Sequence, residues 1–176
     1  MDFEEVNKLL LQADYLNARS VLGKHTELGQ LVASGPASSP HLIAISETRL
    51  SDDVPDGYLV LPGYSTLFRA DRCRLGTSAA GTQQTPARRG GGVLFLVRDD
   101  AQCWRRDDLQ FWSESVWIEI KTTSLKSVVF GCFYRPPLSL LTDIDRFLEA
   151  LDASLERISQ RWTHIVGDFN TTSPQY

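Results

Sequence analysis

The sequence predicts an α/β (α+β) fold in which packed β-sheets are covered by helices on their outer faces. Short apolar runs follow one another along most of the chain, and their lengths suit strands. Two segments with helical periodicity interrupt them, at 24–34 and from Thr142 onward. Strands in a run with occasional helices favour packed sheets with helices outside them.

The strand-like runs are bounded by turn residues or polar side chains. They lie at 41–46, 58–61, 64–68, 91–97, 115–121, 126–134 and 163–169. The helix from Thr142 has the clearest pattern, because its apolar residues fall on one stripe. They are Ile144, Phe147, Leu148, Leu151, Leu155 and Ile158. Thr142, three positions before Asp145, is typical of the capping box that starts a helix.

The composition is that of one folded domain. The chain has 176 residues, 42% of them hydrophobic, which is enough to bury a sizeable core. Two stretches, 33–40 and 74–92, are rich in small residues and proline and indicate loops rather than domain boundaries. Residues 1–10 are assigned to an extra N-terminal segment, with a helix as one option, and 11–176 to the domain.

Charge and hydropathy limit the classes of partner. The net charge of −4 makes the whole molecule a poor attractor of phosphate backbones, so any nucleic-acid binding must be local. No apolar run approaches the roughly 20 residues that span a bilayer, and the acidic start lacks the basic region of a secretory signal. We expect an intracellular protein, in the nucleus or the cytoplasm. Cys73, Cys103 and Cys132 are widely spaced and are expected to be reduced.

Several apolar runs end in side chains that bind metals or move protons. These residues are Asn17, Glu47, Tyr134, Asp168 and Asn170. Ligand and catalytic groups are common where strands give way to loops, so we expect the five to converge on one rim. Two carboxylates in one cleft repel each other unless a cation lies beside them. Carboxylate and amide oxygens favour Mg²⁺ or Mn²⁺ over zinc.

The motifs that carry these residues resemble, in their order, those of the endonuclease/exonuclease/phosphatase superfamily. They are "YLNARSVLGKHTEL", "IAISETRL", "FRADR", "RRGGGVLFLVR", "WIEI", "GCFYRPP" and "GDFN". They look most like the endonuclease domain of non-LTR (LINE-type) retrotransposons, from about Leu11 to Pro174. An ordered series of motifs is far more specific than any single one.

The resemblance implies a four-layer sandwich, with two mixed sheets face to face and helices outside, and Mg²⁺-dependent hydrolysis of DNA phosphodiester bonds. It implies that Glu47 is the metal ligand and that Asn17 helps to organise the metal and the phosphate. Tyr134 would lie beside the scissile phosphate, Asp168 would orient or deprotonate the attacking water, and Asn170 would stabilise the phosphate oxygens.

Arginines supply the candidates for substrate binding. These are Arg135, which follows Tyr134, and the pair Arg88 and Arg89. The last two belong to a positively charged region that also includes Arg69, Arg72 and Arg74. Such a cluster is usually a solvated loop, yet it is the best local candidate for phosphate contact. The glycines that follow Arg89 indicate a tight turn into a strand rather than a phosphate loop.

The sequence departs from the family pattern after "GDFN". Family members continue through further strands to a Ser/Thr-Asp-His motif whose histidine contacts the scissile phosphate. His25, His41 and His164 all precede "GDFN", and none of them follows an aspartate. We therefore expect 11–176 to be a partial domain, truncated at its C-terminus, with impaired hydrolysis.

Each assignment has an alternative. Asn17 and Asn170 are also typical turn residues, Glu47 suits a solvated strand end, and Tyr134 suits a sheet aromatic before proline. At the level of function, the alternatives to an endonuclease are a non-catalytic domesticated remnant or interaction module, and an enzyme of the same fold that acts on another phosphoester. Besides DNA, the expected partner is a reverse transcriptase domain in a parent polyprotein.

Overall fold

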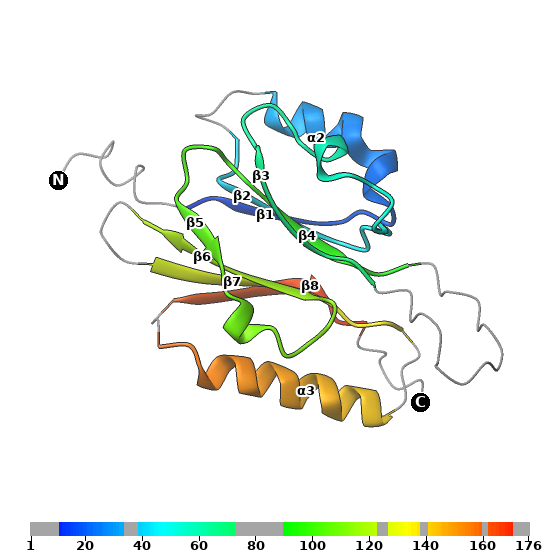
Figure 1. Ribbon diagram of the computed structural model, residues 1–176, viewed down its shortest axis with the longest axis vertical. Coiled ribbons are helices and arrows are strands. Elements are labelled where there is room, and N and C mark those ends of the chain that lie inside the picture. Colours follow the sequence, from blue (N-terminus) through cyan, green and yellow to red (C-terminus); the bar gives the residue numbers. More distant parts are fainter. Residues whose placement is uncertain are drawn as a thin grey trace, which may run out of the picture.

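The computed structural model describes residues 11–33, 39–72, 90–122, 127–137, 141–159 and 162–170. These residues form two four-stranded mixed sheets packed face to face, with α2 and α3 on the two outer faces (Figure 1). The α/β (α+β) sandwich of two sheets flanked by helices is therefore confirmed. None of the helices in these ranges is long and apolar enough to cross a membrane.

The first sheet has the strand order β1-β2-β4-β3. Its strands are β1 (Ala13–Asn17), β2 (Leu42–Ser46), β3 (Thr66–Ala70) and β4 (Val93–Val97). β1 is parallel to β2, and the other two pairs are antiparallel. The connection from β1 to β2 contains the 3₁₀ turn η1 (Val21–Lys24) and the helix α2 (His25–Val32), as a parallel pair requires a crossover.

The second sheet has the order β5-β6-β7-β8. Its strands are β5 (Cys103–Arg105), β6 (Ser115–Lys121), β7 (Ser127–Tyr134) and β8 (Thr163–Asp168). Again one pair is parallel, β7 with β8, and α3 (Leu141–Glu156) forms its crossover. Each sheet therefore has one parallel pair, whose strands end side by side at the same end of the sandwich.

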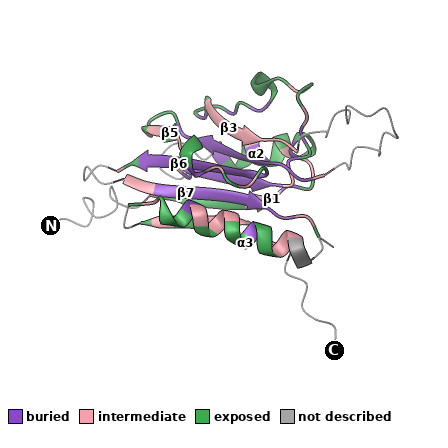
Figure 2. Cartoon of the chain, turned by 60° about the horizontal axis from the view of Figure 1, so that its bottom comes forward, coloured by how far each residue is buried: buried purple, intermediate pink, exposed green. Residues whose placement is uncertain are grey.

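Three apolar clusters hold the four layers together. The cluster between the sheets includes Leu42, Phe95, Ile118 and Cys132. A second lies between the first sheet and α2, and a third between the second sheet and α3. The burial of the side chains agrees with this arrangement. β6 and β7 are buried along most of their length, whereas α3 alternates between buried and exposed positions (Figure 2). Cys103 and Cys132 are free thiols, as expected, and Cys73 lies outside the described residues.

Two details of the predicted elements are wrong. The run 58–61 is not a strand: the 3₁₀ turn η2 (Asp56–Tyr58) ends there, and only an isolated bridge joins Leu61 to Tyr64. Helix α3 begins at Leu141, so Thr142 is its second residue rather than its N-cap.

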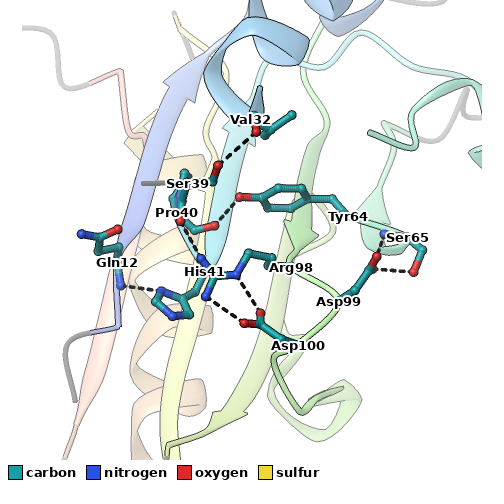
Figure 3. Close-up of polar contacts among 10 residues, drawn as sticks. All are labelled: Gln12, Val32, Ser39, Pro40, His41, Tyr64, Ser65, Arg98, Asp99 and Asp100. Carbon is teal, nitrogen blue, oxygen red and sulfur yellow. Dashed lines mark hydrogen bonds and ion pairs between the residues drawn. The ribbon is translucent and has the colours of Figure 1, made fainter. Parts of the chain in front are cut away.

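A polar network closes the end of the first sheet where β2 begins and β4 ends (Figure 3). The Arg98 guanidinium donates to the Ser39 carbonyl at 2.7 Å and pairs with the Asp100 carboxylate at 2.7 Å. The Tyr64 hydroxyl donates to the Pro40 carbonyl, and His41 Nδ1 accepts from the Gln12 backbone N–H at 3.2 Å. The network therefore fastens the entry of β1 and β2 at the end opposite to Asn17 and Glu47.

Candidate active site

The candidate site lies where the two parallel strand pairs end. Asn17 is the last residue of β1, and Glu47 directly follows β2. In the other sheet, Tyr134 ends β7 and Asp168 ends β8, and these two residues are direct register partners. β1 and β2 both contact β8 across the sandwich, so the four strand ends meet at one rim.

One side chain joins the two carboxylates at this rim. The Asn17 Nδ2 atom donates to Glu47 Oε1 at 3.2 Å and to Asp168 Oδ2 at 2.8 Å. The Asn17 Oδ1 atom in turn accepts the Arg19 backbone N–H at 3.2 Å, which fixes the orientation of the amide. Arg49 contributes an ion pair to Glu47 at 3.4 Å. The Asn17 amide therefore connects the Glu47 carboxylate of one half of the sandwich to the Asp168 carboxylate of the other half.

The backbone around the rim is strained. The non-glycine residues with positive φ in the described part of the chain are Arg19, Ser20, Glu47, Arg49 and Asn170. All five lie within three residues of the end of β1, β2 or β8. Such conformations cost on the order of 1–3 kcal/mol each and persist where the surrounding structure imposes them, often at functional sites. The strain is therefore concentrated where the candidate side chains are presented.

Asn170 lies in the turn that follows β8. The strand ends at Asp168, and Asn170 has a φ of 43°. Its backbone N–H donates to Asp168 Oδ1 at 3.1 Å, and its side-chain Nδ2 donates to the Arg135 carbonyl at 2.7 Å. The chain turns here because the Asp168 carboxylate accepts a backbone group two residues on, a turn that Asp favours.

The Arg135 guanidinium contacts backbone carbonyls of the turn after β8. Only 5% of Arg135 is exposed, and its Nε donates to the Phe169 carbonyl at 2.6 Å. Its Nη2 donates to the Asn170 carbonyl, and its backbone N–H donates to the Asp168 carbonyl at 2.9 Å. Arg135 therefore fastens the turn after β8 to the end of β7.

Tyr134 is nearly buried at the rim, with 5% of its surface exposed. Burial raises the pKa of its hydroxyl, the Glu47 carboxylate adds to this rise, and the Arg72 guanidinium acts in the opposite direction. Since the pKa moves up from a value that is already alkaline, the hydroxyl stays protonated near neutral pH and can donate a hydrogen bond. Tyr15 also lies near both carboxylates, and its hydroxyl shares a hydrogen bond of 2.7 Å with Ser46.

The remaining candidates fall outside this cluster. Arg88, Arg89 and Arg74 lie outside the described residues. Arg69 pairs with Asp56 and Asp71, both at 3.3 Å, so it is engaged with the protein itself. Of the three histidines, His25 begins α2, His41 lies at the far end of the first sheet, and the ring of His164, near the start of β8, stacks on Phe130 of β7.

Solved structures identify the fold, although no protein-family model and no curated sequence match the chain. The endonuclease domain of TRAS1, a telomere-specific non-LTR retrotransposon, matches with a TM-score of 0.58 at 15% identity, over 90% of this chain and 58% of that one. The APE2 catalytic domain from Xenopus laevis gives 0.59 at 14%, over 92% and 59%. The 3′ phosphatase NExo from Neisseria, bound to a product DNA hairpin, gives 0.54 at 16%, over 92% and 58%.

The chain has the endonuclease/exonuclease/phosphatase fold. The four-layer arrangement implied by the resemblance is therefore confirmed. The chain spans 58–59% of the length of these three structures, while nearly all of the chain is included in each match.

The endonuclease/exonuclease/phosphatase resemblance implies a divalent metal, which would need oxygen donors at the rim. Within the described ranges, no cluster of three or more His, Cys, Asp or Glu side chains could hold a metal ion. The rim offers the Glu47 and Asp168 carboxylates joined by the Asn17 amide. Mg²⁺ is commonly held by one or two carboxylates plus substrate phosphates, so this sparse oxygen set fits Mg²⁺ or Mn²⁺ better than zinc.

The rim also contains Glu114, which was not identified from the sequence, and Arg72, which was identified only as part of the positively charged region. Glu114 precedes β6 and Arg72 follows β3, and the two form an ion pair at 2.8 Å beside Tyr134. Glu114 was missed because the acidic and amide candidates all come from the ends of apolar runs. In an antiparallel pair, however, the start of one strand lies beside the end of its neighbour. A search of the residues that precede the strands would have included Glu114.

Proposed function

We propose that the chain is a Mg²⁺- or Mn²⁺-dependent endonuclease domain of retrotransposon origin that hydrolyses DNA phosphodiester bonds at this rim. The observation that carries the proposal is the Asn17 amide, which hydrogen-bonds to Glu47 and to Asp168 at once. Two carboxylates drawn together from different sheets, in a region of strained backbone, favour a catalytic site over a set of solvated strand ends.

The chemistry assigns a separate part to each residue. Glu47 would hold the divalent ion, which when bound neutralises charge that develops on the phosphate oxygens. Asp168 would direct a water molecule to the phosphorus and accept its proton, since both of its oxygens are oriented by hydrogen bonds from Asn17 and Asn170. The protonated Tyr134 hydroxyl would donate a hydrogen bond to a phosphate oxygen.

DNA is the substrate that the comparisons favour. The matched proteins include the endonuclease domain of a non-LTR retrotransposon and a phosphatase bound to a DNA hairpin. The motif order also favours the retrotransposon branch over a phosphoinositide, lipid or RNA-tail hydrolase. In that branch the partners are DNA and a reverse transcriptase domain of the parent polyprotein, and the location is intracellular.

The test combines metal binding with cleavage. Purified 1–176 would be titrated with Mn²⁺ by electron paramagnetic resonance, and nicking of supercoiled plasmid would be followed with Mg²⁺. We expect one Mn²⁺ site that Glu47→Gln weakens, and slow nicking that both Glu47→Gln and Asp168→Asn abolish. Asp145→Asn, on the exposed side of α3, is the matched control and should change neither. Nicking that survives both rim substitutions would refute the proposal.

A non-catalytic domesticated remnant or interaction module is the second candidate. It is favoured by the described part of the chain, in which no cluster of three or more His, Cys, Asp or Glu side chains could hold a metal ion. Mn²⁺ binding and DNA binding without any nicking would favour this candidate over the endonuclease.

A further inference from the structure

A salt-bridged pair outside the candidate catalytic set lies against Tyr134. The Arg72 guanidinium lies over the Tyr134 ring, with its Cζ 5.4 Å from the ring centroid. This is within the range of a cation–π contact, for which about 6 Å is the usual limit. The Glu114 carboxylate holds the guanidinium, with the Arg72 Nε atom donating to Glu114 Oε1 at 2.8 Å. The ring is therefore held from one face by a fixed planar cation.

Glu114 is itself fixed by the glycine run that precedes β4. Only 6% of Glu114 is exposed, and its Oε2 accepts the Gly92 backbone N–H at 2.8 Å. A Cβ atom at Gly91 would lie 2.1 Å from Glu114 Oε2, and Gly91 has a φ of 81°. A side chain at this position would displace the carboxylate, so Gly91 is needed for more than a tight turn.

The same segment fixes the main chain of Tyr134. The Tyr134 backbone N–H donates to the Glu114 carbonyl at 3.0 Å. The Tyr134 carbonyl accepts the indole Nε1–H of Trp112 at 2.9 Å. Residues 112–114 thus hold both backbone groups of Tyr134, while the side chain of Glu114 positions the arginine over its ring.

We propose that Arg72 and Glu114 are positioning residues that hold the Tyr134 ring in the orientation its hydroxyl needs at the rim. This inference rests on the proposed function, because it concerns how Tyr134 takes part in phosphodiester hydrolysis. The pair does not act as a free phosphate-binding charge, since the carboxylate compensates the guanidinium. Its effect reaches the substrate only through Tyr134.

The electrostatics agree with this geometry. The Arg72 charge acts to lower the pKa of the Tyr134 hydroxyl, whereas burial and the Glu47 and Glu114 carboxylates raise it. Without the arginine, the carboxylates would act on the phenol unopposed and its pKa would rise further. The guanidinium therefore offsets the acidic environment while it restrains the ring.

Two measurements test the proposal, NMR of the tyrosine rings for the environment of Tyr134 and plasmid nicking for the rate of the reaction. The tyrosine rings of 1–176 would be labelled with ¹³C and observed by NMR in the wild type, Arg72→Gln and Glu114→Gln. Glu114→Gln keeps an oxygen that can accept the Gly92 N–H, so it guards against simple misfolding. We expect both substitutions to shift the Tyr134 ring resonances and leave those of Tyr64, at the far end, unchanged.

Arg106→Gln provides the matched control. Arg106 pairs at 2.7 Å with Glu119, a β6 glutamate that is also 6% exposed, but Tyr134 is not a partner of this pair. We expect Arg72→Gln to lower kcat for plasmid nicking by roughly 10- to 100-fold with little change in KM, since misplacing a positioned group has this effect. Arg106→Gln should leave kcat unchanged, even if it lowers stability as much.

A double-mutant cycle with Tyr134→Phe decides whether Arg72 acts through the tyrosine. Once the hydroxyl is absent, Arg72→Gln should cause no further loss of kcat. The inference would be overturned if the two substitutions lowered kcat by factors that multiply in the double variant. It would also be overturned if the Tyr134 resonances did not move in Arg72→Gln. If the wild type does not nick DNA at all, the proposed function fails, and the Tyr134 resonances alone decide whether the pair holds the ring.

Discussion

The side-chain nitrogen of Asn17 lies 2.8 Å from a carboxylate oxygen of Asp168, although 151 residues separate the two in sequence. Asn17 ends β1 in one sheet and Asp168 ends β8 in the other. The contact therefore exists only when both sheets have formed and packed together. It makes the candidate site a direct reporter of correct assembly of the sandwich.

Replacing Asn17 with aspartate should make the fold depend on divalent metal. Asn17→Asp removes the shared donor and adds a third negative charge beside Glu47 and Asp168. We expect a loss of about 1–3 kcal/mol in unfolding free energy with EDTA, and recovery of part of it with Mg²⁺. Urea unfolding under both conditions measures this. Asn17→Ala removes the donor without adding charge, so an equal Mg²⁺ response in both variants would contradict the prediction.

Gly167→Ala should be strongly destabilising. Gly167 has a φ of 153°, and a Cβ atom there would lie 2.2 Å from the Phe133 carbonyl oxygen in the neighbouring strand β7. β8 would have to move away from β7, which we expect to cost at least about 2–3 kcal/mol. Gly29→Ala in α2 is the control, because nothing lies within 4 Å of its Cβ position. That variant should be neutral or stabilised by about 0.5–1 kcal/mol in urea unfolding.

Most of the fold could be predicted from apolar periodicity, and the failures have a common physical cause. Leu59 and Leu61 are buried as a strand pattern requires, yet they pack beneath α2 without joining a sheet. Alternation reports which side chains are buried, whereas a strand also needs a partner for its backbone groups. The three-residue strand β5 shows the opposite case. It is too short to have an alternating pattern, but the tertiary fold gives its backbone a partner in β6.

Helix α3 also shows that apolar periodicity predicts a face only approximately. Phe147 and Leu151 pack against the second sheet as predicted, and Ile158 does so from just beyond the end of α3. Ser154 completes the stripe, with its hydroxyl donating to the Leu109 carbonyl at 2.8 Å. Leu148 and Leu155, also assigned to the stripe, are 54% and 40% exposed. They lie to the side of it, because an apolar stripe predicted from spacing is wider than the contact that the sheet provides.

The candidate site was predictable to the extent that it lies at strand ends. Asn17, Glu47, Tyr134 and Asp168 all come from one simple rule about where strands give way to loops. The contact between Arg72 and Glu114 could not be derived in this way, because it depends on which strands are neighbours and in which direction they run. The orientation of Arg135 towards the Phe169 and Asn170 carbonyls depends on the turn after β8, which has no periodic signal in the sequence.

Acid should weaken the far end of the first sheet through His41. Burial and the nearby Arg98 charge lower the pKa of this imidazole, and Asp100 opposes them. Because the folded pKa lies below the ordinary value of about 6.5, the unfolded state binds more protons as the pH falls through that value. This contribution to stability is thus complete above about pH 6.5 and is lost as the pH falls towards the folded pKa.

Urea unfolding at a series of pH values between 5 and 7.5 measures this effect. His41→Asn retains an oxygen that can accept the Gln12 N–H, but it cannot be protonated in this range. We expect its stability to fall less than that of the wild type on acidification. His25→Asn, at an exposed position that begins α2, serves as the control and should follow the wild type. If the unfolding free energy of His41→Asn fell with pH as steeply as that of the wild type, other groups would cause the acid sensitivity.

Arg135→Lys should loosen the turn that follows β8. The guanidinium reaches the Phe169 and Asn170 carbonyls from different nitrogen atoms, and a lysine ammonium, as a single point donor, cannot reproduce that fork. We expect a loss of about 1–3 kcal/mol in unfolding free energy, because partly buried carbonyls lose charged donors. Backbone amide exchange should accelerate at Asp168 to Asn170 more than in β6, since the opening is local. Arg146→Lys, on the exposed side of α3, should change neither quantity. If amide exchange at these three residues stayed at the wild-type rate, Arg135 would not be what holds Asp168 and Asn170 at the rim.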